Sequence, residues 1–319
     1  TGMRLARFSL NDSPRYAFVQ KDETDGKDYL IELDGHPLAG DQVKPTGTRY
    51  PVDGDGIRLL SPVIPSKVYG LAKNYEAHAQ FMHEAGHSEI AHAPEDMVIF
   101  TKPSTSVIGP DDPIVIPSYS NDMNFEPEVA VVMGRIAKNV TVENAMDYVL
   151  GFTCVNDVTL RDLQGIDPTW TRAKGFDTSC PLGPWIVMRD DLDWKDAKIS
   201  FTLNGEDVPM ASGTTANLIH GIPEQIAAIS SFSTLLPGDV IMTGTPNASG
   251  HLDPGDETIV HVEGMNRAVY GEIVTFDNGA KGMVESVDPE QLGIMLFDGA
   301  ETVGVGTMVT RSGKRAGIP

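Results

Sequence analysis

Apolar and polar positions alternate in short runs over the first part of the chain. Runs rich in β-prone residues, at 16–19 and 29–33, lie beside the turn signals Asp25-Gly26 and Asp34-Gly35. Short alternating runs between such turns are typical of strands that bury one face. Pro62 and Pro65 follow and mark a boundary. The pattern predicts a small N-terminal β domain at residues 1–60.

The strand-like pattern continues through the middle of the chain. Its apolar runs lie at 98–100, 113–116, 129–132 and 240–242. Because these runs do not alternate regularly with long helical segments, they predict an α+β, mainly β, domain rather than a βαβ array. We place this domain at residues 61–275. Beyond it the pattern weakens into short glycine-rich runs, a C-terminal extension at 276–319 to which the sequence assigns no role.

Three segments carry helical signals. Residues 74–87 begin with Asn74, a suitable N-terminal cap, and Ala79, Met82 and Gly86 recur at helical spacing. A second helix is predicted at 142–149. A third should begin near Pro223, because proline is well tolerated in the first helical turn.

Charge and composition narrow the function. The 319 residues include 24 basic and 45 acidic side chains, a formal net charge of −21. Such a surface repels nucleic-acid phosphates, so an anionic substrate must be attracted locally by a metal or a few cations. No apolar run approaches the roughly 20 residues of a membrane helix, and no basic-then-apolar leader opens the sequence. We expect a cytoplasmic protein that binds neither nucleic acid nor membrane.

The two cysteines give no sign of a disulfide framework. Cys154 and Cys180 both lie in apolar sequence. We expect them to be reduced thiols packed in the core.

Three carboxylates suggest a metal site. Glu126 and Glu128 lie two apart at the head of an apolar run, so in a strand both point to the same face. Pro127 between them indicates a strand end or sheet edge. Asp157 follows another apolar run. A hard divalent cation would relieve the repulsion among these side chains, and oxygen ligands favour Mg²⁺ or Mn²⁺ over zinc. The alternative is a solvated acidic strand end.

Two further features suggest binding of an anion. Lys174 lies among aromatic residues and glycine, where an ammonium could neutralise an enolate or a carboxylate. The alternative is a surface salt bridge with Asp177. The turn at 243–246 offers hydroxyls and backbone amides that could hold a carboxylate.

Taken together, the motifs resemble those of the fumarylacetoacetate hydrolase family over roughly residues 60 to 265. The segments that carry the resemblance are GLAKNYEAH (70–78), FTKP (100–103), FEPEVAVV (125–132), NDVTLRD (156–162), KGFDT (174–178), PLGPW (181–185), PGDVI (237–241) and TGTP (243–246). Their order and spacing are specific to the family, although no single segment is.

The resemblance implies a rolled, mixed β-sheet and a homodimer. It implies Mg²⁺ or Mn²⁺ bound by Glu126, Glu128 and Asp157, and it makes His78 a base and Lys174 the partner of an enolate or oxyanion. The remaining residues that it implies contact the substrate, a small anionic oxo-acid: Arg161, Gln164 and Thr245.

Family members hydrolyse acylpyruvates and fumarylacetoacetate-like diketones, decarboxylate oxaloacetate, or isomerise unsaturated oxo-diacids. All of these reactions pass through an enolate beside a 2-oxo-carboxylate, which a chelated metal stabilises. The resemblance therefore predicts a metal-dependent C–C hydrolase of 2,4-dioxo acids. Oxaloacetate decarboxylation and isomerisation of the 2-hydroxyhepta-2,4-diene-1,7-dioate type are its alternatives.

The chain departs from the family pattern at two places. Phe81 stands three residues after His78, where the family often has a glutamate that pairs with the histidine. Asn247 to Gly250 follow TGTP, where the family usually reads Gly-Val-Gly. Specificity is expected to depend on the shape of the pocket and on residues 76 to 95.

Two other classes of function are conceivable. The run His83-Glu84-Ala85-Gly86-His87 fits the H-E-x-x-H pattern of zinc proteases, provided that it lies on one helix. A non-catalytic oxo-acid binder would keep the metal site but lack a working base.

Overall fold

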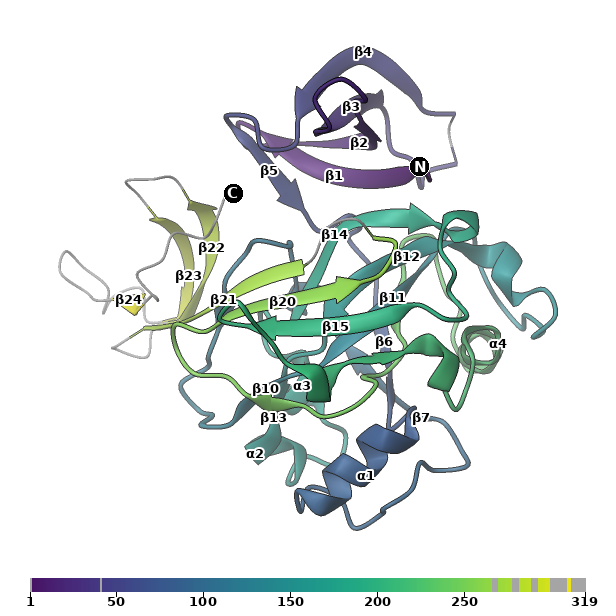
Figure 1. Ribbon diagram of the computed structural model, residues 1–319, viewed down its shortest axis with the longest axis vertical. Coiled ribbons are helices and arrows are strands. Elements are labelled where there is room, and N and C mark those ends of the chain that lie inside the picture. Colours follow the sequence, from purple (N-terminus) through teal and green to yellow (C-terminus); the bar gives the residue numbers. More distant parts are fainter. Residues whose placement is uncertain are drawn as a thin grey trace.

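The computed structural model describes residues 2–40 and 42–265, together with the backbone of four later strands. One mixed sheet of twelve strands dominates the described part (Figure 1). Its main path runs β4-β3-β2-β1-β14-β12-β11-β18-β6-β7, with β5 and β8 attached beside it. The strands of this sheet are β1 (Arg4–Leu10), β2 (Ser13–Lys21), β3 (Asp28–Asp34), β4 (Lys44–Pro51), β5 (Ile57–Leu60), β6 (Val68–Ala72), β7 (Val98–Lys102), β8 (Val107–Ile108), β11 (Pro127–Met133), β12 (Val149–Asn156), β14 (Cys180–Met188) and β18 (Val240–Met242).

A second sheet packs against the middle of the first. Its path is β16-β15-β20-β21-β24, with β17 and β9 at its sides. The strands are β9 (Ile114–Val115), β15 (Lys198–Leu203), β16 (Glu206–Asp207), β17 (Gly213–Thr214), β20 (Glu257–Val262), β21 (Val269–Phe276) and β24 (Val309–Thr310). Phe201 of β15 stacks on Phe125, which lies just before β11, with ring centroids 4.0 Å apart. Fully buried Phe152 and Trp185 belong to the same core.

The remaining strands are short. They are β10 (Met123–Phe125), β13 (Thr159–Leu160) and β19 (Gly250–His251), which form a three-stranded sheet, and the hairpin of β22 (Lys281–Val287) and β23 (Leu292–Asp298). The mainly β, mixed-sheet fold expected from the sequence is confirmed.

Helices are fewer than strands in the described residues. They are α1 (Glu76–Glu84), α2 (Arg161–Gln164), α3 (Thr171–Gly175) and α4 (Ile222–Phe232). α4 packs on the main sheet, where the ring of Phe232 meets Tyr69 of β6 edge-on. Within the described residues, no helix is long and apolar enough to cross a membrane.

The predicted helices differ from the observed ones in their bounds. The segment at 74–87 is helical only as α1, because the Asn74 amide bonds to backbone groups of His220 and Thr243 and Gly86 has a left-handed φ of +77°. The segment at 142–149 forms only a 3-10 turn, Ala145–Tyr148. α4 begins at Ile222, one residue before the expected proline. Neither α2 nor α3 was predicted.

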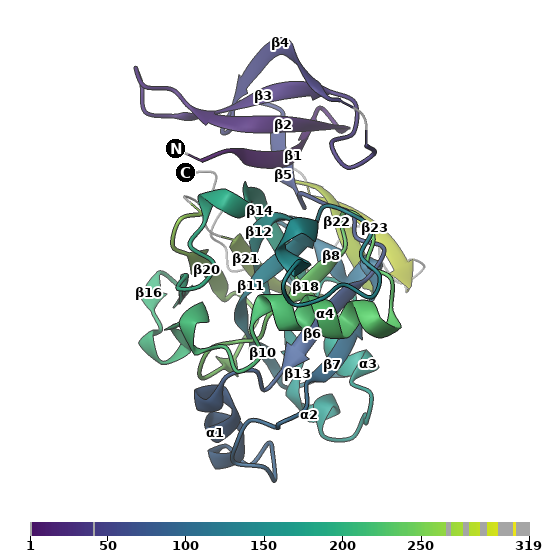
Figure 2. The ribbon, with the colours of Figure 1, turned by 90° about the vertical axis from the view of Figure 1, so that its right-hand side faces the viewer.

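The N-terminal strands form a meander that continues the main sheet. Arg4 and Leu5 of β1 pair with Val187 and Ile186 of β14, so hydrogen bonds cross the predicted boundary after residue 60. Figures 1 and 2 place this meander at one end of the molecule and α1 and α2 at the other. The division at 1–60, 61–275 and 276–319 stays a prediction. Side chains of the C-terminal extension lie outside the described residues.

Close contact between β12 and β14 gives a test of this packing. A Cβ built on Gly151 would lie 2.1 Å from the backbone oxygen of Val187. Gly151→Ala should therefore lower the free energy of unfolding by about 1–3 kcal/mol through overpacking, measured by urea denaturation. Gly165→Ala is the control, because a Cβ there meets no described atom within 4 Å. Equal stability of the two variants would contradict this packing.

Candidate active site

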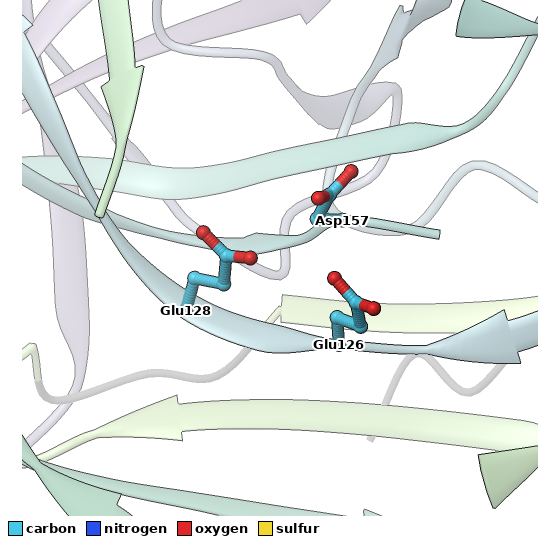
Figure 3. A group of neighbouring side chains, drawn as sticks. All are labelled: Glu126, Glu128 and Asp157. Atoms are coloured by element: carbon cyan, nitrogen blue, oxygen red, sulfur yellow. The ribbon is translucent and has the colours of Figure 1, made fainter. Parts of the chain in front are cut away.

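Three buried carboxylates meet where β10, β11 and β12 converge. Glu126 lies between β10 and β11, Glu128 lies on β11, and Asp157 directly follows β12. The register places Pro127 opposite Asn156, and the Asp157 amide donates to the Glu126 carbonyl at 2.8 Å. One oxygen from each carboxylate lies within 4.8 Å of the others. Figure 3 shows all three side chains in one small region. Because all three side chains are buried, the alternative of a solvated acidic strand end is wrong.

The unbalanced negative charge of Glu128 would favour a cation bound at this cluster. Burial raises the pKa of Glu128 well above its ordinary value, and the charges of Asp157 and Glu126 raise it further. Among the described groups, Glu128 receives a hydrogen bond from the Gly244 amide at 2.8 Å but forms no ion pair. A divalent ion would satisfy this oxygen-only site, and oxygen donors suit Mg²⁺ or Mn²⁺. The residues therefore fit the metal that the family motif implies.

Three cations surround the carboxylates. Lys174 donates to Glu126 and Asp157, each at 2.8 Å, rather than to the Asp177 considered in the sequence. Although burial acts in the opposite direction, the charges of Lys174 and Arg161 hold the pKa of Glu126 below its ordinary value. Arg161 contacts the other Glu126 oxygen at 2.5 Å.

The third cation, Lys102, was not identified as a site residue from the sequence. Its ammonium is fully buried and lies 2.9 Å from Asp157 Oδ1. It also donates to the backbone carbonyls of Lys174 and Ser179. Lys102 therefore fixes both a carboxylate and the segment that carries Lys174. Its only sequence signal was its place in the FTKP motif.

His78, on α1, faces the cluster and is held in place by a backbone carbonyl. Its Nδ1 lies 2.6 Å from the carbonyl oxygen of Asn247. Because a carbonyl only accepts, Nδ1 must carry the proton, which leaves the Nε2 lone pair free. Burial lowers the pKa of His78 to about 4, although the charge of Glu126 acts against this shift. The ring is therefore a neutral base at pH 7.

Phe81 changes the surroundings of this histidine. Its ring stacks on His78 with centroids 6.3 Å apart. The nearby acidic residues do not replace the missing glutamate: Glu76 binds His92 at 2.6 Å and the Ala93 amide at 3.0 Å, and Glu84 is exposed. A backbone carbonyl orients His78 where the family often uses a carboxylate.

A cavity brings most of these groups together. It encloses about 330 Å³ of empty space, open solvent at its mouth included. Its lining residues are Leu71, Ala72, Lys73, His78, Met82, Phe100, Glu126, Gln164, Trp170, Lys174 and Thr245. The Thr245 hydroxyl is buried and has no hydrogen-bond partner among the described residues. A polar group left in this state is suited to bind a substrate.

Arg161 lies behind this wall rather than in it. Its guanidinium contacts Glu126, the Gln164 side chain at 2.7 Å and the Ser249 hydroxyl at 2.6 Å. Ser249 belongs to the loop that departs from the family pattern, and it was not identified from the sequence. The roles predicted for Arg161, Gln164 and Thr245 as substrate contacts stay predictions.

The structure contradicts the zinc-protease alternative, because the motif does not lie on one helix. α1 ends at Glu84, and Gly86 turns the chain away with a left-handed φ. His83 and His87 therefore do not share a helical face, and His83 Nδ1 is engaged by the Ser88 carbonyl oxygen at 3.0 Å. In the part of the chain that is described, only the acidic triad forms a group of three potential metal ligands.

Cys154 and Cys180 are both buried thiols and form no disulfide with any described residue, as expected. Burial raises the pKa of Cys180 to about 12.

Two family models match the chain. Residues 67–273 match fumarylacetoacetate (FAA) hydrolase C-terminal, and residues 3–62 match Rv2993c-like, N-terminal. Protein Rv2993c of Mycobacterium tuberculosis is 39% identical over 267 residues, which cover 82% of this chain and 95% of that protein. Oxaloacetate tautomerase Fahd2a, mitochondrial, of Rattus norvegicus is 37% identical over 217 residues, which cover 65% and 66% of the two chains.

Among solved structures, a 2-hydroxyhepta-2,4-diene-1,7-dioate isomerase from Mycobacterium marinum is similar to this chain. The TM-score is 0.74 at 36% identity, and the match covers 86% of this chain and 98% of that one.

The unpaired carboxylate gives a test of the metal centre. Glu128→Gln should weaken Mg²⁺ and Mn²⁺ binding by about 100-fold or more, about 2.7 kcal/mol, measured by calorimetry. The metal-free variant should also be more stable than the metal-free wild type near pH 8. A carboxyl whose pKa is raised by folding costs stability as pH rises above its unfolded pKa, and the amide removes that cost.

Glu84→Gln is the matched control, because Glu84 is exposed. Wild-type metal affinity in Glu128→Gln would rule out Glu128 as a ligand.

Proposed function

This chain belongs to the fumarylacetoacetate hydrolase family, and on that premise we propose that it interconverts the keto and enol forms of a small 2-oxo acid. The observation that carries the proposal is one cavity lined by Glu126 of the acidic triad, Lys174 and the neutral base His78. Enzymes of this family share the chemistry of an enolate beside a 2-oxo-carboxylate. Mg²⁺ or Mn²⁺ on Glu126, Glu128 and Asp157 would polarise the 2-oxo group of the substrate.

The side chains divide the work as follows. His78 Nε2 takes a proton from the carbon next to the 2-oxo group and returns it in the reverse direction. Lys174 donates a hydrogen bond to the oxygen on which negative charge develops. The unpartnered hydroxyl of Thr245 binds the substrate carboxylate. Each of these groups lines the cavity.

Keto–enol exchange makes fewer demands on the site than hydrolysis does. It needs one proton moved to and from carbon. Hydrolysis also needs a water molecule bound and deprotonated beside the substrate. Two of the similar proteins carry the names oxaloacetate tautomerase and isomerase, and both names describe rearrangement without water.

C–C hydrolysis of acylpyruvate-like acids, the reaction ranked first from the sequence, is the second candidate. The observation in its favour is that the free Nε2 of His78 belongs to a ring lining the cavity beside Glu126 and Lys174. Decarboxylation of oxaloacetate would use the same enolate.

We also propose a homodimer located in the cytoplasm, with a small oxo-acid as its ligand.

Oxaloacetate and acetylpyruvate separate these reactions. With Mg²⁺, the enzyme should accelerate the loss of the ultraviolet absorbance of enol-oxaloacetate at least tenfold over buffer, and EDTA should abolish the effect. Pyruvate release measures decarboxylation of oxaloacetate and hydrolysis of acetylpyruvate in the same samples. Rapid pyruvate release from acetylpyruvate with no effect on the enol would favour the hydrolase. Oxo-acid binding without any turnover would favour the non-catalytic binder.

Lys174→Met tests the role of the ammonium. The variant should lose about 10²–10³ in kcat while Mg²⁺ affinity changes much less, because the lysine acts on charge that develops during the reaction. Stopped-flow absorbance and calorimetry measure the two quantities. Lys138→Met, at an exposed lysine, is the control. An unchanged kcat would remove Lys174 from the mechanism.

A further inference from the structure

Lys73 is a cation of the cavity wall to which the functions above assign no role. It lies between β6 and α1 and lines the cavity together with His78, Glu126 and Lys174. Its ammonium donates a hydrogen bond to the Ser88 hydroxyl at 2.8 Å. It forms no ion pair with any residue that the structure describes.

This lysine differs from the other cations of the site. Lys102, Arg161 and Lys174 each contact a carboxylate of the triad. Lys73 is only partly exposed, and this partial burial lowers its pKa. A positive charge partly removed from water, with a neutral hydroxyl as its protein partner, is well placed to receive an anion.

The formal charges of the site indicate how many negative charges the bound anion should carry. The three carboxylates and the three cations that contact them cancel one another. A bound divalent ion would raise the sum to two positive charges, which balances the enolate of a 2-oxo monocarboxylate. Lys73 brings a third positive charge, and the enolate of a 2-oxo dicarboxylate carries three negative charges.

The backbone holds Lys73 in an uncommon conformation. Its φ is +53°, a left-handed value that side chains other than glycine rarely adopt. Such a conformation costs on the order of 1–3 kcal/mol and is often found at ligand sites. The Ser88 that receives the ammonium lies in the loop after α1, the helix that carries His78.

We propose that Lys73 binds the distal carboxylate of the substrate, so that the enzyme prefers 2-oxo dicarboxylates to 2-oxo monocarboxylates. The proposal rests on the proposed keto–enol function and narrows its substrate class. In this arrangement a divalent ion on the triad, together with Thr245, would hold the 2-oxo-carboxylate head, and Lys73 exchanges its hydrogen bond with Ser88 for an ion pair with the substrate.

The test compares two substrates in three proteins. Enolisation of oxaloacetate, a dicarboxylate, is followed by absorbance, and that of 2-oxobutyrate, a monocarboxylate, by proton–deuterium exchange at C3. The ratio of kcat/KM for the two should fall by about 30-fold or more in Lys73→Met, mainly through KM for oxaloacetate. Lys73→Arg should restore most of the ratio, because it keeps the charge. Lys138→Met removes a lysine away from the cavity and should leave the ratio unchanged.

A second readout does not depend on turnover. Oxalate presents the chelating head without a distal carboxylate, so its dissociation constant in the presence of Mg²⁺, measured by calorimetry, should change less than threefold in Lys73→Met. Equal loss on both substrates would mean that Lys73 only maintains structure, and an unchanged ratio would mean that it does not bind the substrate. Either result overturns the proposal. Failure of the wild type to enolise either substrate would instead reject the proposed function.

Discussion

Repulsion among three buried carboxylates is the constraint around which the rest of the site is arranged. Their oxygens lie within 4.8 Å of one another, out of contact with bulk water. Folding brings them together only because neighbouring elements supply opposite charge. Lys102 comes from β7, Arg161 from α2 and Lys174 from α3. Among the described groups Glu128 is left with a single amide donor and no ion pair, an arrangement that a bound cation would complete.

One loop connects several parts of this arrangement. The Gly244 amide bonds to Glu128, the Asn247 carbonyl accepts from His78, and the Ser249 hydroxyl contacts Arg161. Gly250 then pairs with Phe125, directly before Glu126. The seven residues from Gly244 to Gly250 therefore contact Glu128, His78 and Arg161.

The features of the site that depend on local periodicity could be predicted from the sequence. Those that depend on contacts between distant segments could not. Glu126 and Glu128 could be placed on one face because strand side chains repeat every two residues. Asp157 was chosen because it follows another apolar run, but its place beside the two glutamates depends on the pairing of β11 with β12, which neither strand shows alone. The short helices α2 and α3 carry too few residues for a helical period. Lys102 appeared only as part of the FTKP motif, and the support of His78 by a backbone carbonyl has no side-chain signature at all.

The continuity between the meander and the main sheet has a consequence for how the chain is made. Strands β1 to β5 are local in sequence and can pair as soon as they leave the ribosome. β1, however, meets β14 only after about 120 more residues have followed β5. At roughly 5–20 residues per second, that interval lasts about 6–24 s. During it β5 covers only Arg7 to Leu10 on that edge of β1, so Arg4 and Leu5 have no strand partner there until β14 has been made.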